Sequence, residues 1–305
     1  MIKRILIIGP AGIGKIHLRE FFKLGYNEVG ILGRSNKIMR SFNINLTKGE
    51  KILIHNLKNL VEAKKFSPKI TTICSPFINH YEHINKVSRF CKNILVEKPL
   101  IAFDKKCLNK NIYRLTKKIT DNKKLNILTN LPFVFLAKQF KNKKIVKKKI
   151  NKFFFNYFTK GNQNYDNIAF DLVPHATSFI LSLNNEKLKT IKIKYIKKDK
   201  NFWKCKLTLN NCKCVFQFKQ NKDRVKTDLS FRLNKNFFKR IQIEKNGEPK
   251  IFFVKNNKKL YKINNPMSES INRLEKAFND KIKILENNRL AVDVSIVLNE
   301  IVTHV

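Results

Sequence analysis

The sequence has 305 residues, 43% of them hydrophobic, which excludes a disordered chain and allows two domains with large cores. Its formal net charge of +42 raises the possibility of a nucleic-acid or membrane partner. However, the basic residues are 53 Lys and only 11 Arg, and Lys, Asn, Ile and Phe, all abundant here, have codons rich in A and T. Base composition explains much of the charge. We therefore expect no specific nucleic-acid partner and no membrane partner, with a functional basic surface as the alternative.

The cysteines give no sign of a metal site. None of the six forms a C-x-x-C pair, and Cys212 and Cys214 lie in an alternating stretch without a second pair or a nearby His. No segment approaches the roughly 18 apolar residues of a membrane span, and the N-terminal apolar run is too short for a signal peptide. We expect free thiols, no metal and a cytoplasmic protein.

The chain opens with a strand, a glycine turn and a helix. Residues 5–8 are a buried-strand run, and residues 15–24 have a helical apolar pattern that is closed by Gly25. A P-loop would need a hydroxyl where Ile16 stands, whereas the dinucleotide fingerprint G-x-G-x-x-G lacks only its middle glycine. The pattern favours a dinucleotide, with a P-loop or a turn that binds nothing as alternatives. The expected pyrophosphate contacts are Gly9, Ala11, Gly12, Ile13 and Gly14.

The second strand, residues 28–32, indicates which dinucleotide is bound. NAD sites place an Asp or Glu near its end to bind the ribose hydroxyls, and Arg is the usual adaptation to a 2′-phosphate. This chain has Arg34 and Ser35 there and no acid. Both side chains can bind a phosphate, so NADP is favoured over NAD. The alternative is an arginine exposed in a turn.

Two further strands end in polar residues. Residues 69–74 form a strand that is followed by Ser75, Pro76 and His80, and a strand from Asn93 ends at Glu97 and Lys98 because Pro99 cannot donate to a sheet. Alternating strands and helices predict a parallel, doubly wound sheet. In such a sheet the carboxyl ends of the strands form the ligand-binding edge, so Lys98 can point into a cleft.

Together these motifs resemble the Gfo/Idh/MocA family of NAD(P)-dependent oxidoreductases. The resemblance rests on the glycine turn followed by His17, on Ser75-Pro76 with Asn79-His80, and on Lys92 with Glu97-Lys98-Pro99. It implies that Lys98 sits between nicotinamide and substrate. It also implies that Ser75, Pro76, His80, Glu97 and Lys98 contribute to the cofactor site. This chain departs from the family at Ala11, in the missing acid, and in lacking the Arg that members with a second domain carry near Pro132 or Phe133.

A second group of chemical residues lies at Asp171 and His175. Because proline is favoured in the first turn of a helix, Pro174 predicts that His175 lies at a helix N-terminus, where the imidazole is kept neutral, with Asp171 just before it. The alternative is that Asp171 caps the helix and His175 is an ordinary first-turn residue. The family resemblance implies that both are catalytic, in the second domain, and that they face the lysine.

The rest of the chain predicts the second domain. Residues 188–260 alternate as in a half-buried antiparallel sheet, and two helices follow, the last at 289–302. We predict an N-terminal Rossmann domain, residues 1–125, and a C-terminal α+β domain, residues 126–305, with a mixed or antiparallel open sheet. The final helix could pack towards the first domain. The active site is expected between the domains, and the family suggests a homo-oligomer formed through the open sheet.

The expected reaction is hydride transfer between NADP and a secondary alcohol or ketone of a sugar, polyol or sugar derivative. The catalytic residues would be Lys98, Asp171 and His175, and the substrate would also contact Tyr165, with Tyr157 and Asn164 as further pocket candidates. The alternative function is a dinucleotide-binding or sensor protein without catalysis.

Overall fold

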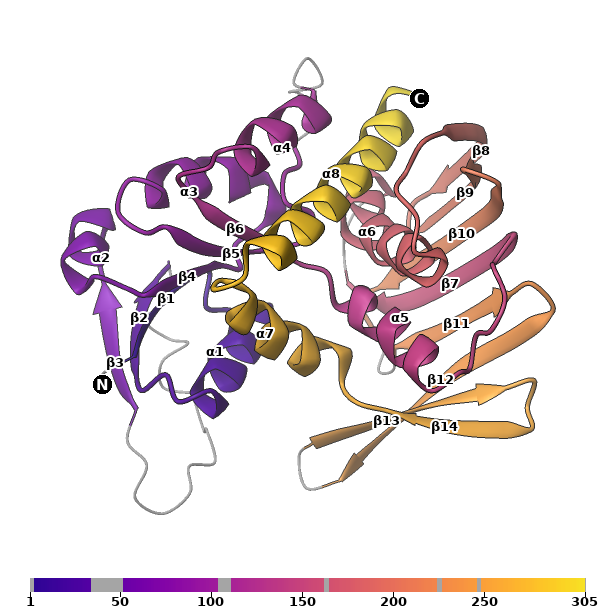
Figure 1. Cartoon of the computed structure of the whole chain (residues 1–305), viewed down its shortest axis with the longest axis horizontal. Helices are drawn as coiled ribbons and strands as arrows, with labels where there is room; N and C mark the ends of the chain where they lie inside the picture. The colour runs from indigo at the N-terminus through magenta and orange to yellow at the C-terminus, as the bar shows by residue number, and fades with distance from the viewer. Residues whose placement is uncertain are drawn as a thin grey trace. The chain divides into compact units, whose positions relative to one another are not determined.

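A computed structural model describes residues 3–33, 52–103, 111–161, 165–223, 227–245 and 248–304 (Figure 1). The chain divides into two compact units, one formed by residues 1–130 with 271–292 and the other by residues 131–270 with 293–305. Within the described ranges, no helix has both the length and the apolar character needed to cross a membrane.

The first unit is built on a sheet of six parallel strands. Its order is β3-β2-β1-β4-β5-β6, so the direction of strand addition reverses between β1 and β4. This confirms the predicted doubly wound sheet, a fold in which ligands bind outside the carboxyl ends of the strands where the strand order reverses. The strands are β1 (Arg4–Ile8), β2 (Glu28–Leu32), β3 (Leu53–Leu57), β4 (Ile70–Ile73), β5 (Asn93–Glu97) and β6 (Asn126–Asn130).

Helices pack on this sheet through apolar residues of the strands. Ile94, Leu95 and Val96 of β5 are fully buried, as the unbroken aliphatic run predicts for a central parallel strand. Asn59 caps one helix through its side-chain oxygen, which accepts hydrogen bonds from the next backbone amides. The helices are α1 (Ile13–Lys23), α2 (Leu60–Phe66), α3 (His80–Val87) and α4 (Ile112–Thr120), with a 3₁₀ turn, η2 (Phe77–Asn79), before α3.

The second unit is built on one mixed sheet of eight strands. Its order is β14-β13-β12-β11-β7-β10-β9-β8, and β7 pairs parallel with β10 while the other neighbours are antiparallel. The predicted mixed open sheet is thereby confirmed. The strands are β7 (Lys152–Lys160), β8 (Ile191–Asp199), β9 (Phe202–Leu209), β10 (Cys212–Asn221), β11 (Asp228–Leu233), β12 (Asn236–Lys245), β13 (Glu248–Lys255) and β14 (Lys259–Ile263).

Helices α5 (Pro132–Asn142) and α6 (Tyr165–Asn184) cover one face of this sheet (Figure 1). The core between them is largely aromatic: the Phe140 ring of α5 contacts Phe179 of α6 and Phe231 of β11. Aromatic side chains bury large apolar areas, and their edge-to-face contacts add further stabilisation. The opposite face alternates between half-buried and exposed side chains, as expected for a sheet covered on one side.

Two helices follow the second sheet, α7 (Pro266–Ala277) and α8 (Lys281–Thr303). Residues 271–292 join the first unit, and the end of α8 joins the second. Strand β6 pairs with β5, so the first unit runs to Asn130, five residues beyond the predicted domain boundary between 125 and 126. The cysteines that the structure describes are free and buried, and Cys107 lies outside the described residues.

Candidate functional site

The glycine turn joins β1 to α1 at the carboxyl edge of the first sheet. Gly9 and Gly12 have φ values of +80° and +51°, a region that favours glycine. A Cβ on Gly9 would lie 2.6 Å from the backbone nitrogen of Ser75, and one on Gly14 would lie 2.3 Å from the carbonyl oxygen of Gly9. Gly9 is therefore packed closely against the end of β4, and Gly14 against Gly9, so that side chains at both positions are excluded.

This geometry fits the pyrophosphate of a dinucleotide. The turn leads directly into α1, whose first residue is Ile13, so backbone amides and the positive end of the helix dipole lie at the ligand-binding edge. Ala11 replaces the middle glycine of the fingerprint without preventing the turn, since the Gly14 amide still donates to the Ala11 carbonyl oxygen over 2.9 Å.

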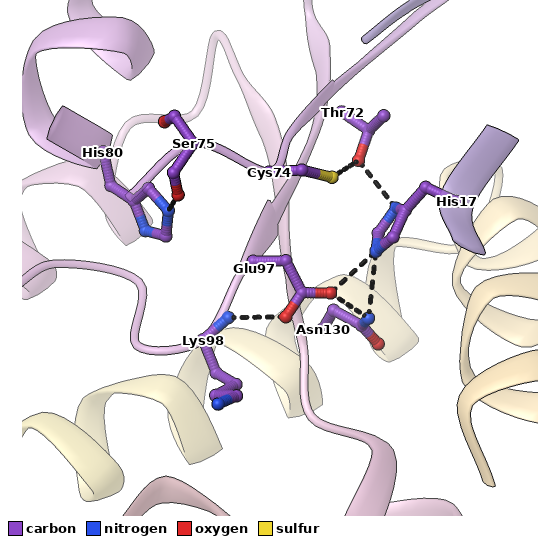
Figure 2. Close-up of polar contacts among 8 residues, drawn as sticks. All are labelled: His17, Thr72, Cys74, Ser75, His80, Glu97, Lys98 and Asn130. Atoms are coloured by element: carbon purple, nitrogen blue, oxygen red, sulfur yellow. Dashed lines mark hydrogen bonds and ion pairs between the residues drawn. The ribbon is translucent and has the colours of Figure 1, made fainter. Parts of the chain in front are cut away.

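A buried polar network links α1 to the ends of β5 and β6 (Figure 2). His17 Nε2 lies 2.7 Å from Glu97 Oε1, and the Asn130 side-chain amide donates to the same oxygen over 2.6 Å. Glu97 and Asn130 are direct partners in the β5–β6 register. Thr72 Oγ1 lies 2.8 Å from His17 Nδ1 and 3.5 Å from Cys74 Sγ. The network thus joins four segments of the first unit.

His17 and Glu97 form an ion pair. A short contact between an imidazole nitrogen and a carboxylate oxygen needs a proton between them. Burial alone lowers the pKa of His17, but Cys74 and Glu97 outweigh it and raise the pKa to about 10. Burial likewise opposes the charged form of Glu97, but its contacts with His17 and Lys98 hold its pKa below the usual value. At neutral pH the pair is therefore an imidazolium and a carboxylate.

Lys98 stands directly after β5 with its backbone fixed. The second carboxylate oxygen of Glu97 accepts a hydrogen bond from the Lys98 amide over 3.3 Å, and the Lys98–Pro99 peptide bond is cis. Both oxygens of Glu97 thus bond within the protein. The Lys98 side chain is half-buried at the carboxyl edge of the sheet, where an ammonium group can bind an oxygen that gains negative charge.

His80 connects the segment after β4 to the segment after β5. Its Nδ1 lies 2.8 Å from the carbonyl oxygen of Pro99, and its Nε2 lies 2.9 Å from that of Ser75. Carbonyl oxygens only accept, and burial lowers the pKa of His80 and favours the neutral ring, whose single N–H donates to one of the two oxygens. The ring thus lies between two backbone segments, while the Ser75 hydroxyl lies 2.8 Å from His83 Nδ1.

The position of His175 differs from the prediction. Helix α6 begins at Tyr165 and continues through Pro174, so Asp171 and His175 lie in its interior, one turn apart on the same side of the helix. The prediction that His175 lies at a helix N-terminus is therefore wrong.

Aromatic rings and an amide surround this pair in the second unit. The His175 ring is buried, with ring centroids 4.6 Å from Phe133 and 5.8 Å from Tyr157. Phe133 therefore lies against His175. Phe133 is one of the two positions near which members of the family carry an Arg. The side-chain amide of Gln220 donates to Asp171 Oδ2 over 2.8 Å.

Several predicted residues cannot be placed. Arg34, Ser35 and Asn164 lie outside the described residues, and Tyr165 is described only as the first residue of α6. Asn130 and Gln220 were not among the predicted site residues, and His17 was predicted only as part of the family resemblance. The available signal was a polar residue ending an apolar strand pattern, which both Asn130 and Gln220 show. Among described residues, no three His, Cys, Asp or Glu side chains gather as a metal site would require.

Solved structures show the same fold over the whole chain. A 3-ketoreductase from Actinomadura kijaniata, solved with NADP and TDP-benzene, is 12% identical with a TM-score of 0.69, covering 98% of this chain and 97% of that one. A UDP-N-acetylglucosamine 3-dehydrogenase from Acidithiobacillus ferrooxidans is 8% identical with a TM-score of 0.68, covering 100% and 98%. A dehydrogenase from Thermus thermophilus, solved with NAD and UDP-GlcNAcA, is 15% identical with a TM-score of 0.63, covering 99% and 95%.

The sequence itself gives a more specific match in its first third. A search of curated proteins finds no match. The model of an oxidoreductase family with an NAD-binding Rossmann fold matches residues 3–118, which include the glycine turn, His17, His80 and Lys98. Residues 3–118 are thus similar to the Gfo/Idh/MocA oxidoreductases, as the motifs predicted.

Proposed function

We propose that this protein is an NADP-dependent oxidoreductase that transfers a hydride between nicotinamide and a secondary alcohol or ketone of a sugar, polyol or sugar derivative. The observation that carries the proposal is the position of Lys98. It follows the central strand β5 at the edge where the glycine turn lies, and its backbone is held by Glu97. A lysine fixed there is suited to bind a reacting oxygen beside a dinucleotide.

The cofactor site would be formed by the first unit. Gly9 to Gly14 would hold the pyrophosphate, since the turn that presents their backbone can form only because residues 9 and 14 lack side chains. Arg34 and Ser35 would hold the 2′-phosphate that distinguishes NADP from NAD. When bound, the nicotinamide supplies the hydride acceptor or donor.

The chemistry of alcohol oxidation assigns a role to each remaining residue. His175 would take the hydroxyl proton, and the C–H hydrogen would leave with its electron pair to the bound nicotinamide, so that a C=O bond forms. Lys98 would bind the oxygen and stabilise the negative charge that develops on it. Asp171 would orient the imidazole and stabilise its protonated form. Tyr165, Asp171, His175 and Lys98 would contact the substrate.

The sugar class is supported by the proteins with the same fold. One of them is a dehydrogenase of a UDP-linked sugar and another is a 3-ketoreductase, so both act on a CH–OH group or the corresponding ketone. Their bound cofactors differ, since the 3-ketoreductase was solved with NADP and the Thermus thermophilus dehydrogenase with NAD. The choice of NADP here rests on Arg34, Ser35 and the missing acid.

The test begins with calorimetric titration of the protein with NADPH and NADH, at moderate salt to suppress nonspecific attraction to the basic surface. Tight NADPH binding with weak NADH binding supports the proposal and justifies a screen of sugars, keto sugars and their nucleotide derivatives. Tight binding of NADH alone would overturn the choice of cofactor. Binding without turnover across the panel would favour the sensor function.

Once a substrate is found, Lys98→Ala and His175→Ala are compared with Lys92→Ala. Lys92 precedes β5 and is exposed, so its variant controls for the loss of one positive charge. We expect each active-site variant to reduce kcat at least about 100-fold, the usual lower contribution of a positioned acid–base group. If Lys98→Ala and His175→Ala both retain full turnover, the assigned mechanism is wrong.

The open face of the second sheet bears on assembly. Exposed Ile241, Ile243 and Leu260 lie on strands β12 and β14, on the face opposite the one that Phe238 and Phe253 present to α5. This supports a homo-oligomer formed through that face. The molar mass of the wild type and of Ile243→Asp is measured by light scattering, and we expect an oligomer for the wild type and a smaller mass for the variant. The mass of a single chain for the wild type would contradict the proposed homo-oligomer.

A further inference from the structure

We propose that Gln220 is a positioning residue for the proposed reaction and that it holds the carboxylate of Asp171 in place. The proposal rests on the proposed function, in which Asp171 orients His175. Gln220 lies near the end of β10, and its side-chain amide donates to Asp171 Oδ2 over 2.8 Å. The two residues are separated by 49 positions in sequence, so only the packing of α6 on β10 brings them together.

Gln220 interrupts an apolar pattern. The side chains that β10 turns towards the helices are otherwise those of Cys212, Cys214, Phe216 and Phe218, all buried. Gln220 continues this series and is only 2% exposed. Burying a primary amide is unfavourable unless its groups are hydrogen-bonded, whereas an apolar side chain could fill the same space without this cost. A buried amide at this position therefore indicates that Gln220 is there to form a hydrogen bond.

The backbone of Gln220 is fixed on both sides. It pairs with Thr159 of β7, and its amide donates to the carbonyl oxygen of Asn201 over 3.0 Å. The side chain is thus projected from a rigid element, which is the arrangement needed to place a carboxylate reproducibly.

Gly161 provides the space in which the amide lies. A Cβ at Gly161 would come within 2.5 Å of Gln220 Oε1 and 2.7 Å of its Cδ. The Gly161 amide also donates to the carbonyl oxygen of Asn221, so the chain after β7 cannot easily move away. Because Gln220 is buried, its side chain cannot swing into solvent to relieve the contact. The lack of a side chain at Gly161 therefore leaves the space in which the Gln220 amide reaches Asp171.

The chemical consequence concerns the direction of the Asp171 carboxylate. A carboxylate that accepts one bond from a fixed donor loses rotational freedom and presents its other oxygen in a defined direction. His175 lies one helical turn further along α6, on the same side. Fixing Asp171 from β10 would therefore fix the group that orients the catalytic imidazole.

Gln220→Met and Gln220→Glu separate packing from hydrogen bonding. The first keeps the size and removes the donor, and the second replaces the donor by a carboxylate that repels Asp171. Gln217→Met and Gln217→Glu are the matched controls, since Gln217 is half-buried on the other face of the same strand. Gly161→Ala displaces the Gln220 amide without altering either partner. NADPH binding and thermal melting confirm that each variant is folded.

With a substrate in hand, we expect Gln220→Met and Gly161→Ala to lower kcat about tenfold, the effect of one lost hydrogen bond to a charged group. We expect Gln220→Glu to move the acid limb of the kcat/KM profile up by about one pH unit, because two adjacent carboxylates bind a proton. A purely structural role would lower the melting temperature and leave the pH profile of the folded fraction unchanged.

A second readout needs no substrate. The ring protons of His175, assigned by their loss in His175→Gln, are titrated by NMR. We expect the midpoint to rise in Gln220→Glu and to stay at the wild-type value in Gln217→Glu. Equal midpoints in these two variants, or wild-type kcat and pH profile in Gln220→Met and Gln220→Glu, would overturn the proposal. Full turnover of Lys98→Ala and His175→Ala would instead refute the proposed function, and the NMR titration would still decide whether Gln220 acts on this pair.

Discussion

The Nε2 atom of His17 and the Oε1 atom of Glu97 lie 2.7 Å apart, and both side chains are almost completely buried. The acid that precedes Lys98 is thereby bound to the first helix of the unit. The other carboxylate oxygen of Glu97 accepts a hydrogen bond from the Lys98 backbone amide. The ion pair therefore helps to hold the backbone of Lys98 in place.

Removing one member of this pair should be strongly destabilising. Glu97→Ala leaves the His17 imidazole buried without its counter-ion, and we expect a loss of about 3–5 kcal/mol in the free energy of unfolding measured with urea. The control is Glu82→Ala, which removes an exposed ion pair with Lys86 and should leave the midpoint almost unchanged. Similar midpoints for the two variants would contradict the buried pair.

The same pair predicts a pH dependence of stability. An unfolded imidazole titrates near 6.5 and that of His17 near 10, so between these values the folded protein binds one proton more than the unfolded chain. The stabilisation is complete below pH 6.5 and is lost as the pH rises towards 10, with a slope of up to about 1.4 kcal/mol per pH unit. Urea unfolding from pH 7 to 10 measures it. His17→Gln should remove this slope, and an unchanged slope would place the titration elsewhere.

The glycine turn predicts selective loss of cofactor binding. Gly9→Ala places a Cβ 2.6 Å from the Ser75 backbone, so either the turn or the end of β4 must shift, and we expect NADPH affinity to fall at least about tenfold. Gly25→Ala is the control, because Gly25 also has a positive φ, +81°, but no atom lies within 4 Å of the added Cβ. It should lose about 1 kcal/mol of stability and keep its affinity. Equal affinities would show that the turn does not hold the cofactor.

The choice between cofactors should depend on Arg34. Arg34→Ala removes a cation that would pair with the 2′-phosphate, so we expect NADPH affinity to fall about tenfold or more while NADH affinity stays constant. Arg89→Ala is the control for charge, since Arg89 is exposed after α3. Calorimetry at two salt concentrations separates a specific contact from general attraction to the basic surface. A parallel fall in NADPH and NADH affinity would contradict the assignment.

The first unit was largely predictable because its signals are local. Unbroken aliphatic runs such as Ile94 to Val96 indicate buried parallel strands, and Gly9 and Gly14 stand where only glycine fits. The contacts of Asn130 and Gln220 depend instead on strand register and helix packing between distant segments, which no local pattern contains.

Pro174 shows why a local rule failed. Proline is favoured in a first helical turn, but inside α6 it removes only one backbone bond, to the carbonyl of Phe170. The buried residues Ile168, Ala169 and Phe170 hold the preceding turn of helix in place by packing. Tertiary contacts therefore outweighed the preference of a single residue.

The first unit is discontinuous in sequence, which has a consequence for biosynthesis. Its last segment, residues 271–292, includes Asn287, whose side chain accepts from the Thr129 amide over 2.7 Å and donates to the Thr129 carbonyl over 2.9 Å. Glu275 likewise accepts from the Tyr26 hydroxyl. Since these residues leave the ribosome only after the strands of the second sheet, the first unit cannot reach its final state during translation of its own strands. It is completed only after the strands of the second sheet have been synthesised.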